Sequence, residues 1–335
     1  MSQDWNSLIL DSRPPADAWS GIFSALLSVA RQSTSPVALH EATVEPDRLL
    51  AEAAWELWKE FPGRATHTAD ELIHWTGGKP PAAGLAVAEK SVAYLPPHQA
   101  QAVLIIDALS LRELPLLLSA ASNRNIKPLR VAVTGAECPS TTDHFAKAIG
   151  LPSRSAMAND TKPASFALFS EACYTDVISM PFEDCAVPSV PNVVLWHSWL
   201  DDLIHQQKLP DQIASITATV LKGDGFWSFI DRLRKGRKLV ITSDHGYAVS
   251  KLFSSEVADP DAIDILRTTF GASRNTAAAT PWQKSFMPPI VMTHNKQHVV
   301  MGQRKWKVQG GFPHVCHGGM SLLETVVPWI ELSSI

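Results

Sequence analysis

Four short segments of the chain are rich in apolar residues and end abruptly in polar or charged side chains. They are residues 102–106, 129–134, 193–196 and 239–242. Apolar runs this short and dense are typical of strands that are buried on both faces, as in a parallel sheet. Because ligands of such sheets bind where the strands end, the polar residues that follow are the first candidates for a functional site.

The first 95 residues have a different pattern, in which apolar residues recur at helical spacing between residues 15 and 78. The recurring side chains are Trp19, Ile22, Phe23, Leu26, Leu27, Leu49, Leu50, Ala54, Trp55 and Trp58. Proline pairs at residues 80–81 and 96–97 mark a boundary before the first strand. We therefore expect an α/β fold with a mainly parallel sheet flanked by helices in residues 96–335, and a helical N-terminal appendage in residues 1–95.

Two longer segments, residues 151–191 and 250–288, are rich in Pro, Ser, Thr and Ala and show little periodicity. We expect them to form lids or walls of a substrate site, as long connections at strand ends often do. A basic cluster at residues 232–238 closes an amphipathic helical pattern, with Gly236 just past the helix end. Since this cluster precedes the strand that ends at Asp244, it should lie on the face opposite the site.

The composition favours a globular enzyme of the cytoplasm. With 335 residues, 45% hydrophobic content and a net charge of −4, the chain can bury a sizeable core and has no general attraction for nucleic acid. No apolar run reaches the roughly 18 residues of a membrane span, and the N-terminus lacks the pattern of a signal peptide. The 4 cysteines form no close pairs, which argues against a disulfide framework and a Cys-type zinc site.

Carboxylate and imidazole side chains follow the predicted strands, and one further histidine, His317, precedes two glycines just before the final apolar stretch. Together they are numerous enough to bind two metal ions. They are Asp107, Asp201, His205, Asp244, His245 and His317. Asp201 and His205 are four residues apart, so on one helical turn they face the same way. Each residue also has an ordinary alternative role. The aspartates are common helix caps or surface partners, and a single histidine is often a hydrogen-bonded core residue.

A hydroxyl nucleophile could complete this set of side chains. Residues 138–150 follow the strand at 129–134 and are predicted to be a loop that opens a helix. Thr141 and Thr142 lie at or near the start of that helix, where free backbone amides favour anions such as phosphate. Either threonine is also a good helix N-cap, so the local pattern leaves the choice between them open.

In this order along the chain, the motifs resemble those of the alkaline phosphatase superfamily. The motifs are Asp107 after a strand, Pro139-Ser140-x-Thr142, Asp201-x-x-x-His205, Thr242-Ser-Asp244-His245-Gly246 and His317-Gly-Gly. The closing segment, residues 317–328, resembles the PglZ domain in particular. PglZ domains occur in BREX phage-defence systems and in the PorX response regulator. The resemblance covers residues from about 100 to 332.

The resemblance implies a role for each candidate residue. One zinc ion would be held by Asp107, Thr142, Asp244 and His245, and the other by Asp201, His205 and His317. Thr142 would be the nucleophile, chosen over Thr141 because it fits the Pro-Ser-x-Thr spacing.

The sequence also departs from the family pattern. Ser110 and Leu111 stand where PglZ domains often have an arginine soon after the aspartate. A sulfatase of the same superfamily is disfavoured, because Cys138-Pro-Ser-Thr-Thr has neither the spacing nor the arginine of the sulfatase motif.

The expected function is that of a zinc-dependent phosphoesterase with an alkaline phosphatase-like fold. The resemblance favours phosphodiesters, such as nucleotides or oligonucleotides, and a role in phage defence. Two alternatives stay open, a phosphomonoesterase and a non-catalytic PglZ-like scaffold subunit of a defence complex. The N-terminal helical region is the expected docking region for protein partners, and no contact with a membrane is expected.

Overall fold

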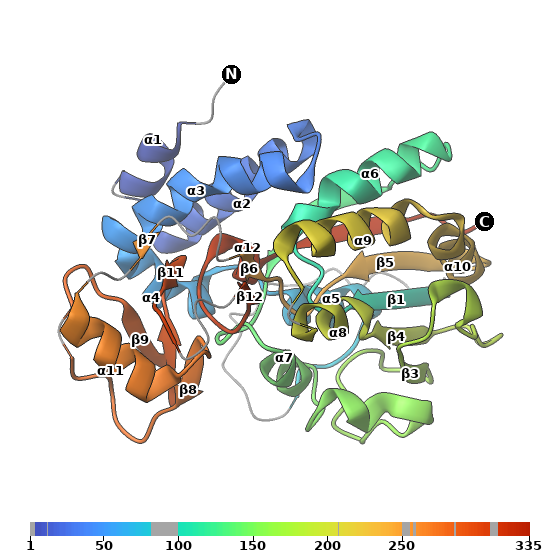
Figure 1. Ribbon diagram of the computed structural model, residues 1–335. Coiled ribbons are helices and arrows are strands. Elements are labelled where there is room, and N and C mark those ends of the chain that lie inside the picture. Colours follow the sequence, from blue (N-terminus) through green and yellow to red (C-terminus); the bar gives the residue numbers. More distant parts are fainter. Residues whose placement is uncertain are drawn as a thin grey trace.

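The computed structural model describes residues 4–11, 13–81, 100–206, 208–249, 255–256, 259–284, 286–308 and 314–335. Its centre is a six-stranded sheet with the strand order β2-β13-β5-β1-β4-β3 (Figure 1). The strands are β1 (Gln101–Ile106), β2 (Arg130–Gly135), β3 (Tyr174–Ile178), β4 (Val193–His197), β5 (Lys238–Thr242) and β13 (Val326–Leu332). The apolar runs seen in the sequence therefore form β1, β2, β4 and β5, as predicted.

The sheet is mainly parallel, which confirms the expected fold class. β1 pairs in parallel with β4 and β5, and β3 pairs in parallel with β4. The exception is β13, which lies between β2 and β5 and is antiparallel to both. The C-terminal ends of β1, β4 and β5 consequently meet at the same edge of the sheet.

Alternate strand residues pack against helices on the two faces of the sheet. On one face, Leu104 and Leu195 share a core with helices of the N-terminal region and with α6 (Leu114–Asn123), α9 (Pro210–Lys222) and α10 (Asp224–Arg234). On the other face, Val103 and Trp196 pack with α5 (Thr68–Thr76) and α7 (Thr142–Ala148). This burial on both faces explains why β1, β4 and β5 have no alternation of polar and apolar residues.

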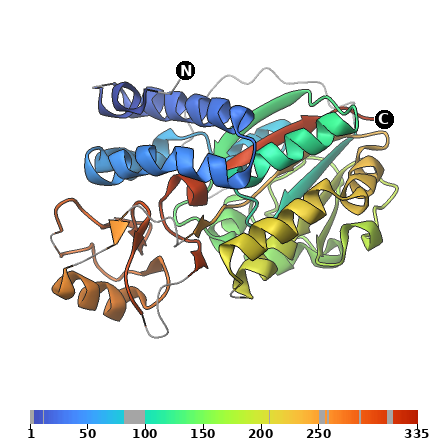
Figure 2. The same ribbon diagram turned by 45° about the horizontal axis from the view of Figure 1, so that its top comes forward.

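The N-terminal region is helical, as its periodicity predicts. Its helices are α1 (Trp5–Leu10), α2 (Pro15–Gln32), α3 (Pro36–Glu52), α4 (Trp55–Arg64) and α5. Figure 2 shows α2 and α3 side by side, with α6 next to one end of the pair. Trp19 and Trp58 are fully buried with ring centroids 5.0 Å apart, in the same apolar core as the sheet. The expected boundary at residue 95 lies outside the described residues, and the division into two domains stays a proposal.

A smaller lobe lies between β5 and β13 in the sequence. It contains α11 (Pro260–Phe270) and the three-stranded sheet β8-β10-β9, formed by Asn275–Ala277, Gln297–Val300 and Val291–His294. Its apolar residues form a core of their own, centred on Leu266, Phe270 and Trp306. The short remaining elements are β6 (Ala248–Val249), β7 (Ser255–Glu256), β11 (Arg304–Lys305), β12 (Val315–Cys316), α8 (Trp199–His205), α12 (Leu322–Thr325) and the 3₁₀ helices Leu111–Glu113, Arg154–Asp160 and Phe182–Asp184.

The expectation that residues 151–191 and 250–288 are irregular connections was wrong in part. The first segment supplies the edge strand β3 and the 3₁₀ helix Arg154–Asp160, and the second supplies α11. In α11 the buried residues Ala262, Leu266 and Phe270 do recur at helical spacing, but over only eleven residues in a polar sequence. Short elements like these are fixed by packing more than by local pattern.

The basic cluster has the structural role expected of it. α10 ends at Arg234, and Gly236 follows with a positive φ of 72°. Arg237 is buried and donates hydrogen bonds to the carbonyl groups of Pro188 and Val190, both at 2.6 Å. The cluster precedes β5, and so lies at the opposite end of that strand from Asp244.

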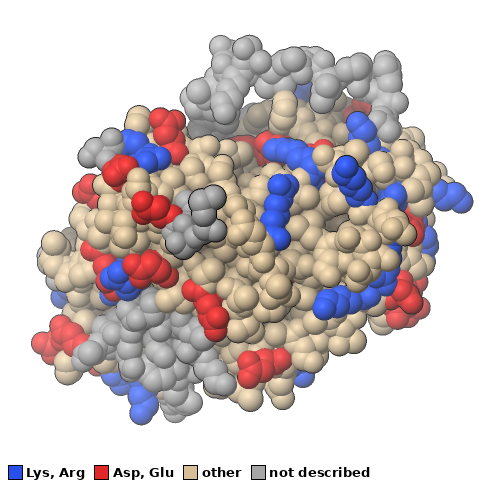
Figure 3. Space-filling view, turned by 90° about the horizontal axis from the view of Figure 1, so that it is seen from above, with Lys and Arg blue, Asp and Glu red and all other residues tan. Residues whose placement is uncertain are grey.

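The molecular surface seen from above carries both signs of charge, separated by wide neutral areas (Figure 3). On the described part of this face, most of the Lys and Arg side chains lie in the right half of the view, with Asp and Glu side chains among them and to the left. Within the described residues, no helix combines the length and the apolar character needed to cross a membrane.

Candidate metal centre

The site is built where the parallel strands end. Asp107 directly follows β1, and Asp244 comes two residues after β5. β4 leads into α8, which carries Asp201 and His205 on one face, as their spacing predicts. His317 follows β12 in the C-terminal part of the chain. The topology thus brings together segments as far apart in the sequence as Asp107 and His317.

Asp107, Asp244 and His245 form the first group of potential ligands, and all three are fully buried. His245 Nε2 lies 3.6 Å from Asp107 Oδ1 and 3.4 Å from Asp244 Oδ2. The hydroxyl of Thr142, the first residue of α7, lies 3.3 Å from Asp107 Oδ1 and 3.2 Å from His245 Nε2. The hydroxyl oxygen is therefore directed into this group.

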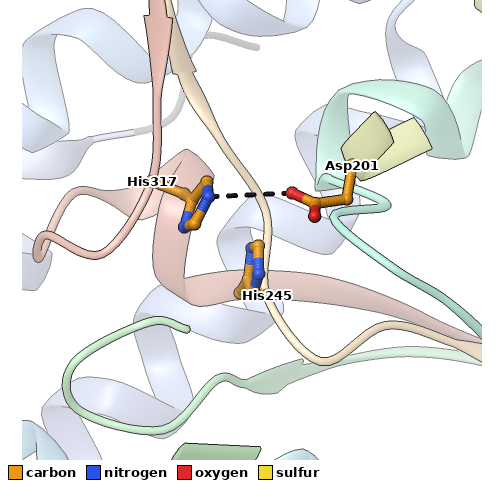
Figure 4. A group of neighbouring side chains, drawn as sticks. All are labelled: Asp201, His245 and His317. Carbon is orange, nitrogen blue, oxygen red and sulfur yellow. Dashed lines mark ion pairs between the residues drawn. The ribbon is translucent and has the colours of Figure 1, made fainter. Parts of the chain in front are cut away.

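Asp201, His245 and His317 form the second group (Figure 4). His317 Nε2 lies 3.6 Å from Asp201 Oδ1. His205 adjoins this group, with its Nε2 3.3 Å from Asp201 Oδ1 and 3.4 Å from His317 Nε2. The imidazole rings of His245 and His317 stack with centroids 4.5 Å apart. The structure thus brings all seven candidate residues into one continuous cluster.

His245 lies between the two groups, which its place in the sequence does not indicate. Its Nδ1 is 2.9 Å from the carbonyl oxygen of Gly246 and donates a proton to it. Nε2, the other ring nitrogen, faces the carboxylates of Asp107 and Asp244. A backbone carbonyl that orients an imidazole in this way is usual behind metal-binding histidines.

The site concentrates negative charge away from water. Burial raises the pKa of Asp107 well above its usual value, and the carboxylate of Asp244 raises it further. Burial also raises the pKa of Asp244, to about 6. Buried carboxylates in contact need a proton or a cation to compensate their charge.

Several buried polar atoms of the cluster have no hydrogen-bond partner within the described structure. They are Asp201 Oδ1, Asp244 Oδ2 and His317 Nδ1. Burial holds the pKa of His317 well below its usual value, and His245 and His205 lower it further, so its imidazole is neutral and can act as a ligand. Unpartnered carboxylate oxygens beside the neutral imidazole of His317 fit a divalent metal ion.

The structure gives the two adjacent threonines different environments. Thr141 is the N-cap residue of α7, but its hydroxyl lies 2.8 Å from His144 Nδ1 and makes no capping hydrogen bond to the backbone. Thr142 faces Asp107 and His245 instead. The geometry favours Thr142 as the hydroxyl of the site.

Arg154 is a further member of the site that the sequence did not reveal. Its guanidinium forms an ion pair with Asp107 Oδ2. Burial lowers the pKa of Arg154, but the carboxylate of Asp107 raises it by more, so the pKa lies above its usual value. Arg154 belongs to the segment expected to form a wall of the site, and no local pattern distinguishes it there. Ser110, by contrast, donates a hydrogen bond to the carbonyl oxygen of Leu323, 3.0 Å away.

No protein-family model matches this sequence, and the search of curated proteins found no match to it. Solved structures do show similarity. Phosphonoacetate hydrolase from Sinorhizobium meliloti 1021, solved with phosphonoacetate, is similar over 71% of this chain and 90% of its own, at 10% identity and a TM-score of 0.37. Murine ectonucleotide pyrophosphatase / phosphodiesterase 5, solved as an inactive variant with AMP, is similar over 70% of this chain and 88% of its own, at 13% identity and a TM-score of 0.43.

Proposed function

We propose that this protein is a zinc-dependent phosphoesterase in which Thr142 is the nucleophile. The observation that carries the proposal is the position of the Thr142 hydroxyl, 3.3 Å from Asp107 Oδ1 and 3.2 Å from His245 Nε2. A hydroxyl held against a buried cluster of carboxylates and imidazoles is the arrangement that nucleophilic catalysis with metal ions requires.

The residues divide between two metal ions. Asp107, Asp244 and His245, with the Thr142 oxygen, would hold the first ion. Asp201, His205 and His317 would hold the second, each set offering at least the three protein ligands that a catalytic zinc site needs. Mixed imidazole and carboxylate ligands suit zinc better than magnesium or calcium, which prefer oxygen alone.

The chemistry follows from where the side chains point. When bound, the metal ions polarise the phosphoryl group and lower the pKa of hydroxyls beside them. Thr142 Oγ1 gives its proton to Asp107 Oδ1 and attacks phosphorus, the bond from phosphorus to the ester oxygen breaks, and the leaving oxygen takes a proton from water and departs as the alcohol. Water then displaces Thr142 from the phosphothreonine intermediate, which restores the hydroxyl. Arg154 is placed to donate hydrogen bonds to phosphoryl oxygens during both steps.

The substrate class rests on the resemblance of the motifs to PglZ domains. It favours phosphodiesters such as nucleotides or oligonucleotides over monoesters, and a cytoplasmic role in phage defence, with the N-terminal helices as the docking region for partners. A non-catalytic scaffold is less compatible with the cluster, because seven side chains able to bind metal or act as a nucleophile converge there, six of them buried or partly buried and His205 exposed.

Metal analysis combined with hydrolysis tests the proposal. The purified protein should contain about two zinc ions per chain and hydrolyse bis-p-nitrophenyl phosphate faster than p-nitrophenyl phosphate. A chelator should abolish both activities, and added zinc should restore them. Metal without turnover of either ester would favour the scaffold, and faster turnover of the monoester would reverse the proposed substrate class.

Replacing His317 with alanine should lower the zinc content from about two ions per chain toward one. His317 and Asp201 belong to the second group, and without the imidazole too few ligands are left for an ion there. Elemental analysis and a chelator competition titration would measure the change. His314→Ala is a suitable control, because His314 is exposed and lies only three residues away. Unchanged stoichiometry in His317→Ala would remove His317 from the ligand set.

A further inference from the structure

One buried hydroxyl connects the loop before Thr142 with the loop that carries His317. Ser140 is fully buried. Its Oγ accepts a hydrogen bond from the backbone amide of Gly318 at 3.1 Å and donates one to the carbonyl oxygen of Gly319 at 2.7 Å. Ser140 therefore holds the two residues after His317 from a position two residues before Thr142.

The backbone next to His317 has little room to change its conformation. Gly318 has a φ of +92°, and a Cβ atom there would lie 2.2 Å from Asn275 Nδ2. On the far side, the backbone amide of Gly319 donates a hydrogen bond to Glu324 Oε1 at 3.0 Å. Glu324 is itself fixed by a buried ion pair with Arg274 at 2.7 Å.

The two loops carry different parts of the proposed centre. Thr142 belongs to the first group of side chains, whereas His317 reaches Asp201 of the second group at 3.6 Å. The imidazole of His317 has a nitrogen without a hydrogen-bond partner, so its side chain is not anchored at that atom. Beside its ring contact with His245 at 4.5 Å, the position of His317 depends on its backbone, which Ser140 and Glu324 hold through Gly318 and Gly319.

We infer that Ser140 is a positioning residue that sets the place of His317, and with it the second metal site, relative to the nucleophile. The inference rests on the proposed function and adds a residue that touches neither metal nor substrate. Loss of its hydroxyl should leave the first group intact and weaken metal binding at the second. Outer partners of metal ligands typically contribute roughly 10–100-fold in metal affinity.

Zinc titration of Ser140→Ala tests this inference. One of the two ions should bind roughly 10–100-fold more weakly than in the parent protein, the other should bind unchanged, and raised free zinc should restore turnover. Thr68→Val is the matched control, because Thr68 is also fully buried and its hydroxyl makes two hydrogen bonds, to Thr134 Oγ1 at 2.7 Å and to the carbonyl oxygen of Gly135 at 3.0 Å. It should lower thermal stability without changing either zinc affinity.

Two outcomes would overturn the inference. The first is a Ser140→Ala protein that binds both ions as tightly as the parent, and the second is equal weakening of both ions. If Ser140→Ala does not fold, Ser140→Cys, whose thiol is a weak hydrogen-bond donor, should show an intermediate loss at one site only. A parent protein that binds no metal would instead remove the proposed function itself, so the two failures are distinguishable.

Discussion

Replacing Thr142 with alanine should reduce hydrolysis of the phosphodiester by on the order of a thousandfold or more while the protein keeps its metal ions. The hydroxyl lies within 3.3 Å of Asp107 and His245, and alanine has no atom that can form the covalent intermediate. Most of the first metal group is retained, because Asp107, Asp244 and His245 are unchanged. Steady-state turnover and zinc content, measured on the same preparation, would establish both parts.

Thr141→Ala is the matched control for the nucleophile. Thr141 is adjacent in sequence, but its hydroxyl pairs with His144 at 2.8 Å and does not face the carboxylates. This variant should keep most of its activity and lose at most about 1 kcal/mol of stability, as expected for a helix N-cap position. If Thr141→Ala is the inactive variant and Thr142→Ala is active, the nucleophile has been assigned to the wrong residue.

Replacing Asp244 with asparagine should remove most of the metal from the first group and abolish turnover. Asparagine keeps the shape of the side chain but loses the negative charge that holds a divalent cation. We expect the affinity for one ion to fall by more than about 100-fold, beyond the range seen for partners outside the ligand set. Competition with a chromophoric chelator would measure it. Zinc binding equal to that of the parent protein would show that Asp244 is not a ligand.

Asp202→Asn is the control for this substitution, because Asp202 is exposed on α8 and its carboxylate accepts a hydrogen bond from the Ser198 hydroxyl at 2.6 Å.

Metal binding by the parent protein should also depend on pH. Burial raises the pKa of Asp244 to about 6, so protons compete with the metal as the pH falls through 6. In the metal-free protein, the stability that protonated Asp244 contributes at low pH is lost as the pH rises through that value. Zinc should therefore raise the melting temperature more at pH 8 than at pH 5.

Much of the sheet and of the ligand set follows from local sequence. Short, dense apolar runs favour strands buried on both faces, and parallel strands end at a common edge. That is why Asp107 and Asp244 could be placed near each other, and why the spacing of Asp201 and His205 predicts one helical face. The antiparallel strand β13 could not be placed in the same way, because an apolar run does not reveal its direction or its neighbours.

The tertiary structure alone decided how these residues combine. His245 lies between two ligand groups, Arg154 reaches Asp107 from a segment without periodicity, and Ser140 joins two loops about 180 residues apart. Contacts of this kind depend on strand register and on how loops pack, which local composition does not encode. The sequence by itself determined the residue types and the strand ends on which they stand. Their distances, and hence which atoms can share an ion, were fixed only when the sheet edge, α7, α8 and the C-terminal loop packed together.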